Sequence, residues 1–156
     1  MLLQPEVSSR LGHAKSCQAL LYAPLDKPLT FRQTQRYEFE FSGSEEGLTD
    51  FVRKVLLDEV SQDLHLDGEP VFHECQFFLE YGMKPGALDL EKETILAYHR
   101  AQTASNFEIT SLKIYTRLYV FNEAREATSP EPFIKDIVNP AIHVWHVTDV
   151  PSSSCA

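Results

Sequence analysis

The feature that most constrains this chain is a two-residue alternation of apolar and polar side chains, which is typical of a half-buried β-strand. It is clearest in "RYEFEF", where Tyr37, Phe39 and Phe41 alternate with charged residues. The same alternation runs through "FEITSLKIYTRLYVF" at positions 107–121. Its phase slips near residues 110–111, which predicts a β-bulge or a bend there. We therefore expect a sheet with one apolar and one polar face.

Part of this long segment is apolar on both sides of the strand. Leu118 and Val120 share one side. Tyr115, Tyr119 and Phe121 share the other. A strand with this pattern is covered on both faces. We expect the chain's own helices to cover one face and another polypeptide to cover the second.

Three segments have the pattern of helices. In the first, apolar residues recur at three- and four-residue steps from Leu48 to Leu64, after a capping serine at position 42 or 44. The glycine and proline of "DGEP" stop this helix. Further helices are expected from Asp89 to about Gln102 and from about Ser129 to Val138.

Two more strands are expected at 71–81 and 141–147, which completes an α+β pattern. Phe78 lies on the polar side of the first of these and is a candidate interface residue. The most economical arrangement is a mostly antiparallel sheet with the helices gathered on one face. We assign residues 1–30 to an extended arm, 31–150 to a single α+β domain and 151–156 to a disordered tail.

The composition excludes several classes of protein. A length of 156 residues suits one domain. With 14 basic and 23 acidic residues the net charge is −9, so we expect no nucleic-acid partner. The three widely spaced cysteines, Cys17, Cys75 and Cys155, do not form a disulfide framework. Neither a signal peptide nor a membrane span is recognisable, so we expect a cytoplasmic location and no membrane partner.

No catalytic or metal-binding constellation is visible. His143 and His146 are three residues apart on an expected strand and so point to opposite faces. His73 and Cys75 share a face, but they lack a second pair at ligand spacing. Nucleophile-elbow and nucleotide-binding glycine patterns are also missing from the sequence. We expect no catalytic residue, no metal and no cofactor.

A tight turn is expected between the strand at 71–81 and the helix that follows it. Gly82 and Gly86 supply backbone freedom, and Pro85 disfavours a helical conformation at Lys84. Asp89 can then accept hydrogen bonds from the first N–H groups of the helix. The turn presents Lys84 at the surface.

Three landmarks in the second half of the chain occur in the order and spacing of a known family. They are the strand, lysine-containing turn and helix start in "LEYGMKPGALDLEKETIL", the long strand "FEITSLKIYTRLYVF", and the Asn-Pro turn and final strand in "IVNPAIHVWHV". Through them residues 75–150 resemble the small PurS subunit of phosphoribosylformylglycinamidine synthase, or the PurS-like domain fused to larger synthetases. The chain departs from the family at 90–92, where Pro-Gln-Gly is usual, and at 115–117, where Gly-Lys-Tyr is usual.

The resemblance implies a ferredoxin-like, PurS-like fold and a structural role. Proteins of this family form oligomers and bridge an ATP-dependent synthetase and its glutaminase in purine synthesis, without supplying catalytic residues. We therefore expect a homo-oligomer that binds these protein partners. The residues expected to bind partners are Lys84, Asp89, Tyr115, Arg117, Tyr119, Phe121 and Asn139.

Two other functions remain open. The chain could be a ferredoxin-like ligand-binding or regulatory module unrelated to purines, with a pocket between its helices and its sheet. It could also be a small enzyme that uses His99, Arg100 or His143 in a cleft.

Overall fold

The computed structural model describes residues 1–10 and 12–150, which form an antiparallel sheet and three α-helices. The expected tail at 151–156 lies outside the described residues. The sheet order is β5-β2-β4-β7-β6-β8, and two short strands, β1 and β3, also pair with β4. The strands are β1 Leu2–Leu3, β2 Glu6–Ser9, β3 Lys15–Ser16, β4 Leu29–Gly43, β5 Gln62–His65, β6 Phe77–Met83, β7 Phe107–Asn122 and β8 His143–Asp149. The helices are the 3-10 helix η1 Cys17–Ala19 and the α-helices α1 Glu45–Val55, α2 Leu90–Ala101 and α3 Glu131–Ile137.

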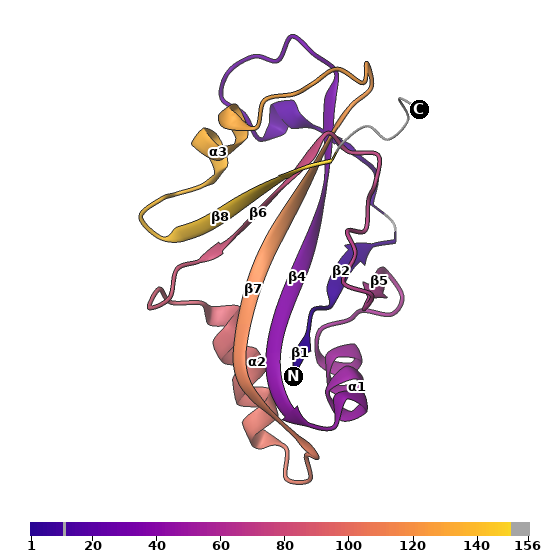
Figure 1. Ribbon diagram of the computed structural model, residues 1–156, viewed down its shortest axis with the longest axis vertical. Helices are drawn as coiled ribbons and strands as arrows, with labels where there is room; N and C mark the ends of the chain where they lie inside the picture. The colour runs from indigo at the N-terminus through magenta and orange to yellow at the C-terminus, as the bar shows by residue number, and fades with distance from the viewer. Residues whose placement is uncertain (11, 151–156) are drawn as a thin grey trace.

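The centre of the sheet is the long pair of β4 and β7, which curve side by side through the length of the molecule (Figure 1). Phe39 lies opposite Leu112, so the apolar residues of both strands point to the same face. Glu40 pairs with Ser111 and Phe41 with Ile109, which leaves Thr110 as an extra residue on β7. The expected β-bulge is therefore confirmed.

All three α-helices cover one face of this sheet, as expected. At one end α1 and α2 lie near the tips of β4 and β7 (Figure 1), and Leu48, Phe51 and Ile95 pack there against Phe39 and Leu112. At the other end α3 covers the same face, with Phe133 packed among residues of β4, β6 and β7. These two clusters are the hydrophobic core, because they hold nearly all of the fully buried aromatic and aliphatic side chains.

The first helix is shorter than expected, which is a correction to the pattern read over 48–64. It ends at Val55, and Asp58 then holds a turn by accepting hydrogen bonds from the Val60 N–H and the Ser61 hydroxyl. The chain leaves this turn as β5, which pairs with β2. Val60 is 81% exposed, while Leu64 packs against the core from a strand. Their four-residue spacing matches the period of a helix, but neither residue lies in one.

The first residues of the chain, expected as an arm, add strands to the sheet. β1, β2 and β3 all pair with β4, and β2 also pairs with β5. Leu3 and Val7 are buried in the core. Pairing with β4 and β5 accounts for the burial of this segment. Its apolar pattern is too short to identify the strands from the sequence alone.

The other elements lie close to their expected positions. The strand expected at 71–81 begins only at Phe77. Residues 71–76 do not pair as part of the strand and instead cross the second face of the sheet. The expected helix after Asp89 is confirmed as α2, with Asp89 as its N-cap. The last helix and strand are confirmed as α3 and β8, each within a few residues.

The second face of the sheet is covered in part by the chain itself. Tyr119 is fully buried there beneath Phe72, whose ring centroid lies 5.0 Å from that of Tyr119. Phe78 and Cys75 belong to the same small cluster. The expectation that another polypeptide covers this part of β7 is therefore wrong, as is the interface role of Phe78. Residues 71–76 provide the cover, and a sequence pattern does not reveal which distant segment does so.

Candidate functional site

The turn between β6 and α2 holds two of the residues expected to bind partners, Lys84 and Asp89. Gly82 allows β6 to lie against β7, since a Cβ atom on it would be 2.6 Å from the Ile114 carbonyl oxygen. Gly86 has a φ of +89°, a left-handed conformation that favours glycine. The Asp89 carboxylate then accepts a hydrogen bond from the Lys92 N–H at 3.1 Å, which caps α2.

Asn139 lies in the loop that leads into β8 and is tied to this turn through the backbone. Its side-chain carbonyl accepts a hydrogen bond from the Ala141 N–H, and its backbone carbonyl accepts from Ile142 and His143. The Ile142 carbonyl in turn accepts the Lys84 N–H at 2.8 Å. The structure therefore brings the Lys84 turn and the Asn139 loop together at the end of β6 and the start of β8.

Apolar side chains are exposed around this junction, and the sequence analysis missed them. Met83, Ile142, Val144 and Trp145 are each about 40% exposed, and Leu88 is 70% exposed. We call these five residues and Lys84 the β8-edge surface. Neighbouring apolar residues on one strand point to opposite faces, so the Val144–Trp145 pair was a signal of an uncovered strand.

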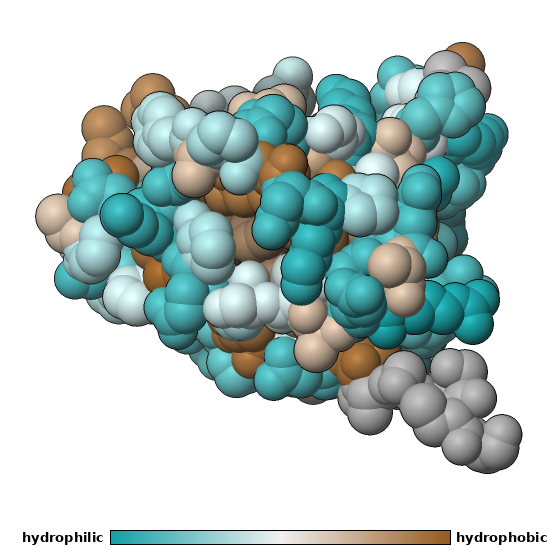
Figure 2. Space-filling model, turned by 90° about the horizontal axis from the view of Figure 1, so that it is seen from above, coloured by the Kyte–Doolittle hydropathy of each residue, from teal (hydrophilic) through white to brown (hydrophobic). Residues whose placement is uncertain are grey.

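Figure 2 shows the molecule from above, where much of the surface is hydrophilic and apolar residues appear in a central hollow and in small areas around it. Isolated apolar residues of this kind are normal on protein surfaces. The β8-edge surface differs because its exposed side chains follow one strand and the turn next to it.

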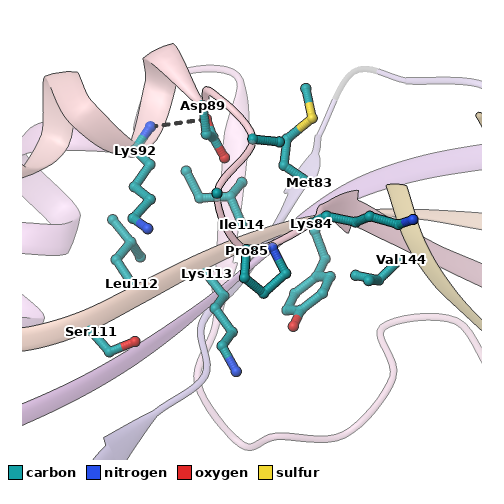
Figure 3. Close-up of a pocket in the computed structure, with 13 residues that line it drawn as sticks. Met83, Lys84, Pro85, Asp89, Lys92, Ser111, Leu112, Lys113, Ile114 and Val144 are labelled. Carbon is teal, nitrogen blue, oxygen red and sulfur yellow. Dashed lines mark hydrogen bonds between the residues drawn. The ribbon is translucent and has the colours of Figure 1, made fainter. Parts of the chain in front are cut away.

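A cavity of about 300 Å³ adjoins the β8-edge surface, between the turn, the start of α2 and the middle of β7. Three lysines, Lys84, Lys92 and Lys113, line it together with one carboxylate, Asp89. Among the residues that the structure describes, these three lysines make no ion pair. Figure 3 shows Lys84 extending past Val144, away from Lys92 and Lys113. The three ammonium groups therefore do not converge on one point, and the cavity presents a positive surface.

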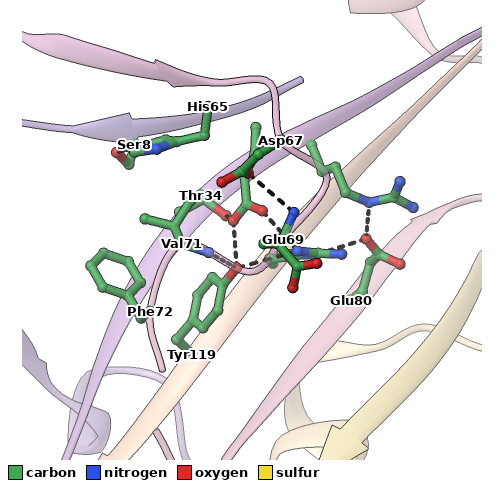
Figure 4. A network of polar contacts seen from close by, with 12 residues as sticks. Ser8, Thr34, His65, Asp67, Glu69, Val71, Phe72, Glu80 and Tyr119 are labelled. Atoms are coloured by element: carbon green, nitrogen blue, oxygen red, sulfur yellow. Dashed lines mark hydrogen bonds and ion pairs between the residues drawn. The ribbon is translucent and has the colours of Figure 1, made fainter. Parts of the chain in front are cut away.

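Two residues expected to bind a partner, Arg117 and Tyr119, instead belong to a polar network on the second face. Tyr119, which is labelled in Figure 4, is fully buried, and the Arg117 side chain is only 11% exposed. Arg117 donates to Glu6 at 2.7 Å and to Glu80 at 3.0 Å, and the Tyr119 hydroxyl donates to Glu6. Thr34 also donates to Glu6, at 2.6 Å. The binding role expected for these two residues is therefore corrected to a structural one.

The ionisation of this network follows from its burial. Burial raises the pKa of Tyr119, and the hydrogen bond that its hydroxyl donates to the Glu6 carboxylate raises it further. Burial alone would lower the pKa of Arg117, but the charge of Glu6 and the neighbouring groups reverse this, so the pKa is raised. Both groups therefore keep their protons at neutral pH.

The remaining two residues on this face, Tyr115 and Phe121, are partly exposed. The Arg36 guanidinium lies 4.8 Å from the centre of the Tyr115 ring, as in a cation–π contact. The Phe121 ring packs against Phe72 at 6.0 Å. Tyr115 also lines the cavity beside Lys84, so of the β7 residues expected to bind a partner it is the one that adjoins the turn.

The residues considered for an enzyme do not form one site. His99 packs between Phe51 and Phe107, and its Nε2 accepts the Ile109 N–H at 3.4 Å. Arg100 and His99 line a cavity between α2 and β7 that does not include His143. His143 accepts the Asn139 N–H at the start of β8. Within residues 1–10 and 12–150, no group of three or more His, Cys, Asp or Glu side chains could hold a metal ion.

No protein-family model, no curated protein and no solved structure matches this chain. In the part of the chain that the structure describes, no helix is both long and apolar enough to cross a membrane. Function must therefore be inferred from the residues of the chain itself.

Proposed function

We propose that this protein is a non-catalytic, PurS-like adaptor that self-associates and binds protein partners through its β8-edge surface. The single observation that carries the proposal is that exposed apolar residues follow β8 and the adjoining Lys84 turn. Surfaces of this kind mark binding sites, because water is released from apolar area when a partner covers them. Lys84 supplies a charge at the edge of this surface, where an acidic group of a partner can pair with it.

A PurS-like, ferredoxin-like origin is part of the same proposal. Its support is that the three landmarks of the resemblance are continuous in space: β6, the Lys84 turn, α2, β7, and the Asn139 loop with β8. The partners would then be the synthetase and the glutaminase of formylglycinamidine ribonucleotide synthesis. We place the protein in the cytoplasm, where Cys17 and Cys75, which are free and buried, would stay reduced.

Reconstitution with the synthetase and glutaminase subunits tests this function. We expect the protein to increase glutamine-dependent amidine formation while ammonia-dependent formation stays the same, because an adaptor acts on the transfer between the two subunits. Lys84→Glu should weaken binding to the subunits, and Lys15→Glu, on the exposed β3 strand, is the matched charge control. No stimulation by the wild-type protein, together with no complex in a pull-down, would contradict the proposal.

The lysine-lined cavity favours a second candidate function, a ligand-binding or regulatory module. Its volume of about 300 Å³ lies at the small end of ligand pockets, and its lysines suit an acidic metabolite. A ligand that binds only the folded state raises the melting temperature without any protein partner. A panel of carboxylates and phosphorylated metabolites tests this, with Lys113→Ala as the variant that should abolish a real shift.

A further inference from the structure

We infer that β8 pairs with β8 of a second copy of this chain, antiparallel and centred on His146. This inference deepens the proposed function, on which it rests, by naming one partner of the β8-edge surface. β8 is the last strand of the sheet and pairs only with β6 among the described strands. Its other edge is therefore open to another strand.

The direction of the backbone groups on β8 follows from the hydrogen bonds at its two ends. The Ile142 carbonyl accepts from Lys84 on one side, and the Val150 N–H donates to Gln76 on the other. Backbone groups alternate in direction along a strand, so even-numbered residues face β6 throughout. The odd-numbered residues His143, Trp145, Val147 and Asp149 therefore direct their N–H and C=O groups to the open edge.

The two edges of the sheet differ in their protection. β5, at the other edge, has only four residues, and Asp63 there forms an ion pair with Arg10 at 2.8 Å. β8 has seven residues without lysine, arginine, proline or a bulge, and Val144 and Trp145 are 38% and 42% exposed. Short length and charge are the usual means of keeping an edge unpaired. β8 has neither, apart from the acidic residue at its end.

A second copy is the occupant that suits β8 best, because the strand is complementary to itself. With His146 at the centre, all seven residues pair, and Trp145 lies opposite Val147 of the second copy, an aromatic–β-branched pair. His143 lies opposite Asp149, so the imidazole and the carboxylate can interact at both ends. Pairing centred on Val144 or Trp145 leaves Asp149 beyond the partner strand. These contacts select the register centred on His146.

This pairing also explains how one small chain could bridge two partners. An antiparallel pair has a two-fold axis perpendicular to the sheet, which keeps the helices of both copies on one face. The Lys84 turn lies at the start of β8, so the two turns would lie at opposite ends of the joined strands. Seven residues at about 3.3 Å each separate them by roughly 20 Å or more.

Cysteine cross-linking tests the register. The two copies of His146 would lie opposite each other on the two-fold axis, as a non-hydrogen-bonded pair. The Cα atoms of such a pair are about 4.5 Å apart, which is within reach of a disulfide. His146→Cys in a Cys155→Ser background should therefore form a covalent dimer under mild oxidation. Val144→Cys in the same background is the control, because its copies would be about 13 Å apart. Equal cross-linking of both variants would overturn this register.

Sedimentation of the full chain tests the pairing itself. We expect a dimer for the wild type and a monomer for Val147→Pro, whose lost N–H points to the open edge and makes no bond to β6. Trp145→Lys, which places a charge on the edge, should also abolish the dimer if the proline variant does not fold. A wild-type monomer at every concentration would overturn the inference. Such a monomer that still stimulates the synthetase would remove self-association but leave the adaptor role between the subunits intact. A dimer that does not stimulate the synthetase would contradict the adaptor role and leave the pairing of β8 intact.

Discussion

The two faces of the sheet are stabilised in different ways. The face under the helices is a continuous apolar core in which Phe39, Leu48 and Leu112 are almost completely buried. The other face is held by charges and hydrogen bonds that join β2, β4, β6 and β7 through Glu6, Arg117 and their partners. Burial of apolar area has no direction, whereas a buried ionic group requires specific partners. The first face therefore accepts other apolar side chains of similar volume, whereas the second requires each charged or hydrogen-bonding partner.

The largest effect is expected on the apolar face. Phe39→Ala should lower the free energy of unfolding by about 4 kcal/mol, because a fully buried ring is lost and leaves a cavity. Chemical denaturation measures this loss. Tyr98→Ala, on the exposed side of α2, is the control and should cost little. A cost for Phe39→Ala as small as that of the control would show that this core is loosely packed.

Breaking the polar network should have the next largest effect. Arg117→Met leaves the buried Glu6 without its cation, while Glu80 keeps its ion pair with Arg36, and should cost about 3 kcal/mol. Adding Glu6→Gln should restore part of this loss, because the amide carries no charge to compensate. Arg10→Met, which breaks an exposed ion pair with side chains about half exposed, should cost roughly 1 kcal/mol or less. Equal costs at Arg10 and Arg117 would contradict a buried network.

The helix caps, which belong to neither face, should have smaller effects. Asp89→Ala and Ser44→Ala each remove a side chain that accepts a hydrogen bond from the first turn of a helix. Each should lower the free energy of unfolding by ~1 kcal/mol. Asp89→Asn and Ser44→Thr keep an acceptor and serve as controls. A loss that also occurs in these controls would point to a role other than capping.

Alkaline pH should weaken the polar face gradually. The pKa of Tyr119 is raised above its ordinary value of 10, so the unfolded chain loses this proton at a lower pH than the folded chain. Stability should therefore fall as the pH rises above 10. Burial also raises the pKa of Cys75 from its ordinary value of 9.0 to about 11. Cys75 therefore adds a further loss of stability as the pH rises above 9. The free energy of unfolding, measured at several pH values, should fall less steeply with pH for Tyr119→Phe than for the wild type. The same slope in both proteins would contradict this prediction.

Several elements could be predicted from the sequence because their causes are local. The phase slip near Thr110 predicted the bulge, and Asp89 predicted the start of α2. The Lys84 turn could be predicted from its glycines and proline for the same reason. In each case a few adjacent residues determine the backbone, so their order in the chain carries enough information.

Other features depended on contacts between distant residues. Leu64 is in a strand and not a helix because β2 lies beside it. Phe72 covers Tyr119 from a segment that has no regular structure. Only part of the candidate site was predictable: the turn was, whereas the exposed residues of β8 depend on which strand occupies the edge of the sheet.

The sequence by itself determined the α+β class, the bulge, the capped helix and the turn that presents Lys84, because periodicity and capping act over a few residues. The tertiary structure alone decided that Arg117 and Tyr119 are internal and that β8 is an open edge. The physical reason is that burial and strand pairing depend on the position of every other element. The order of residues in the chain does not reveal these positions, which are set only when the sheet assembles.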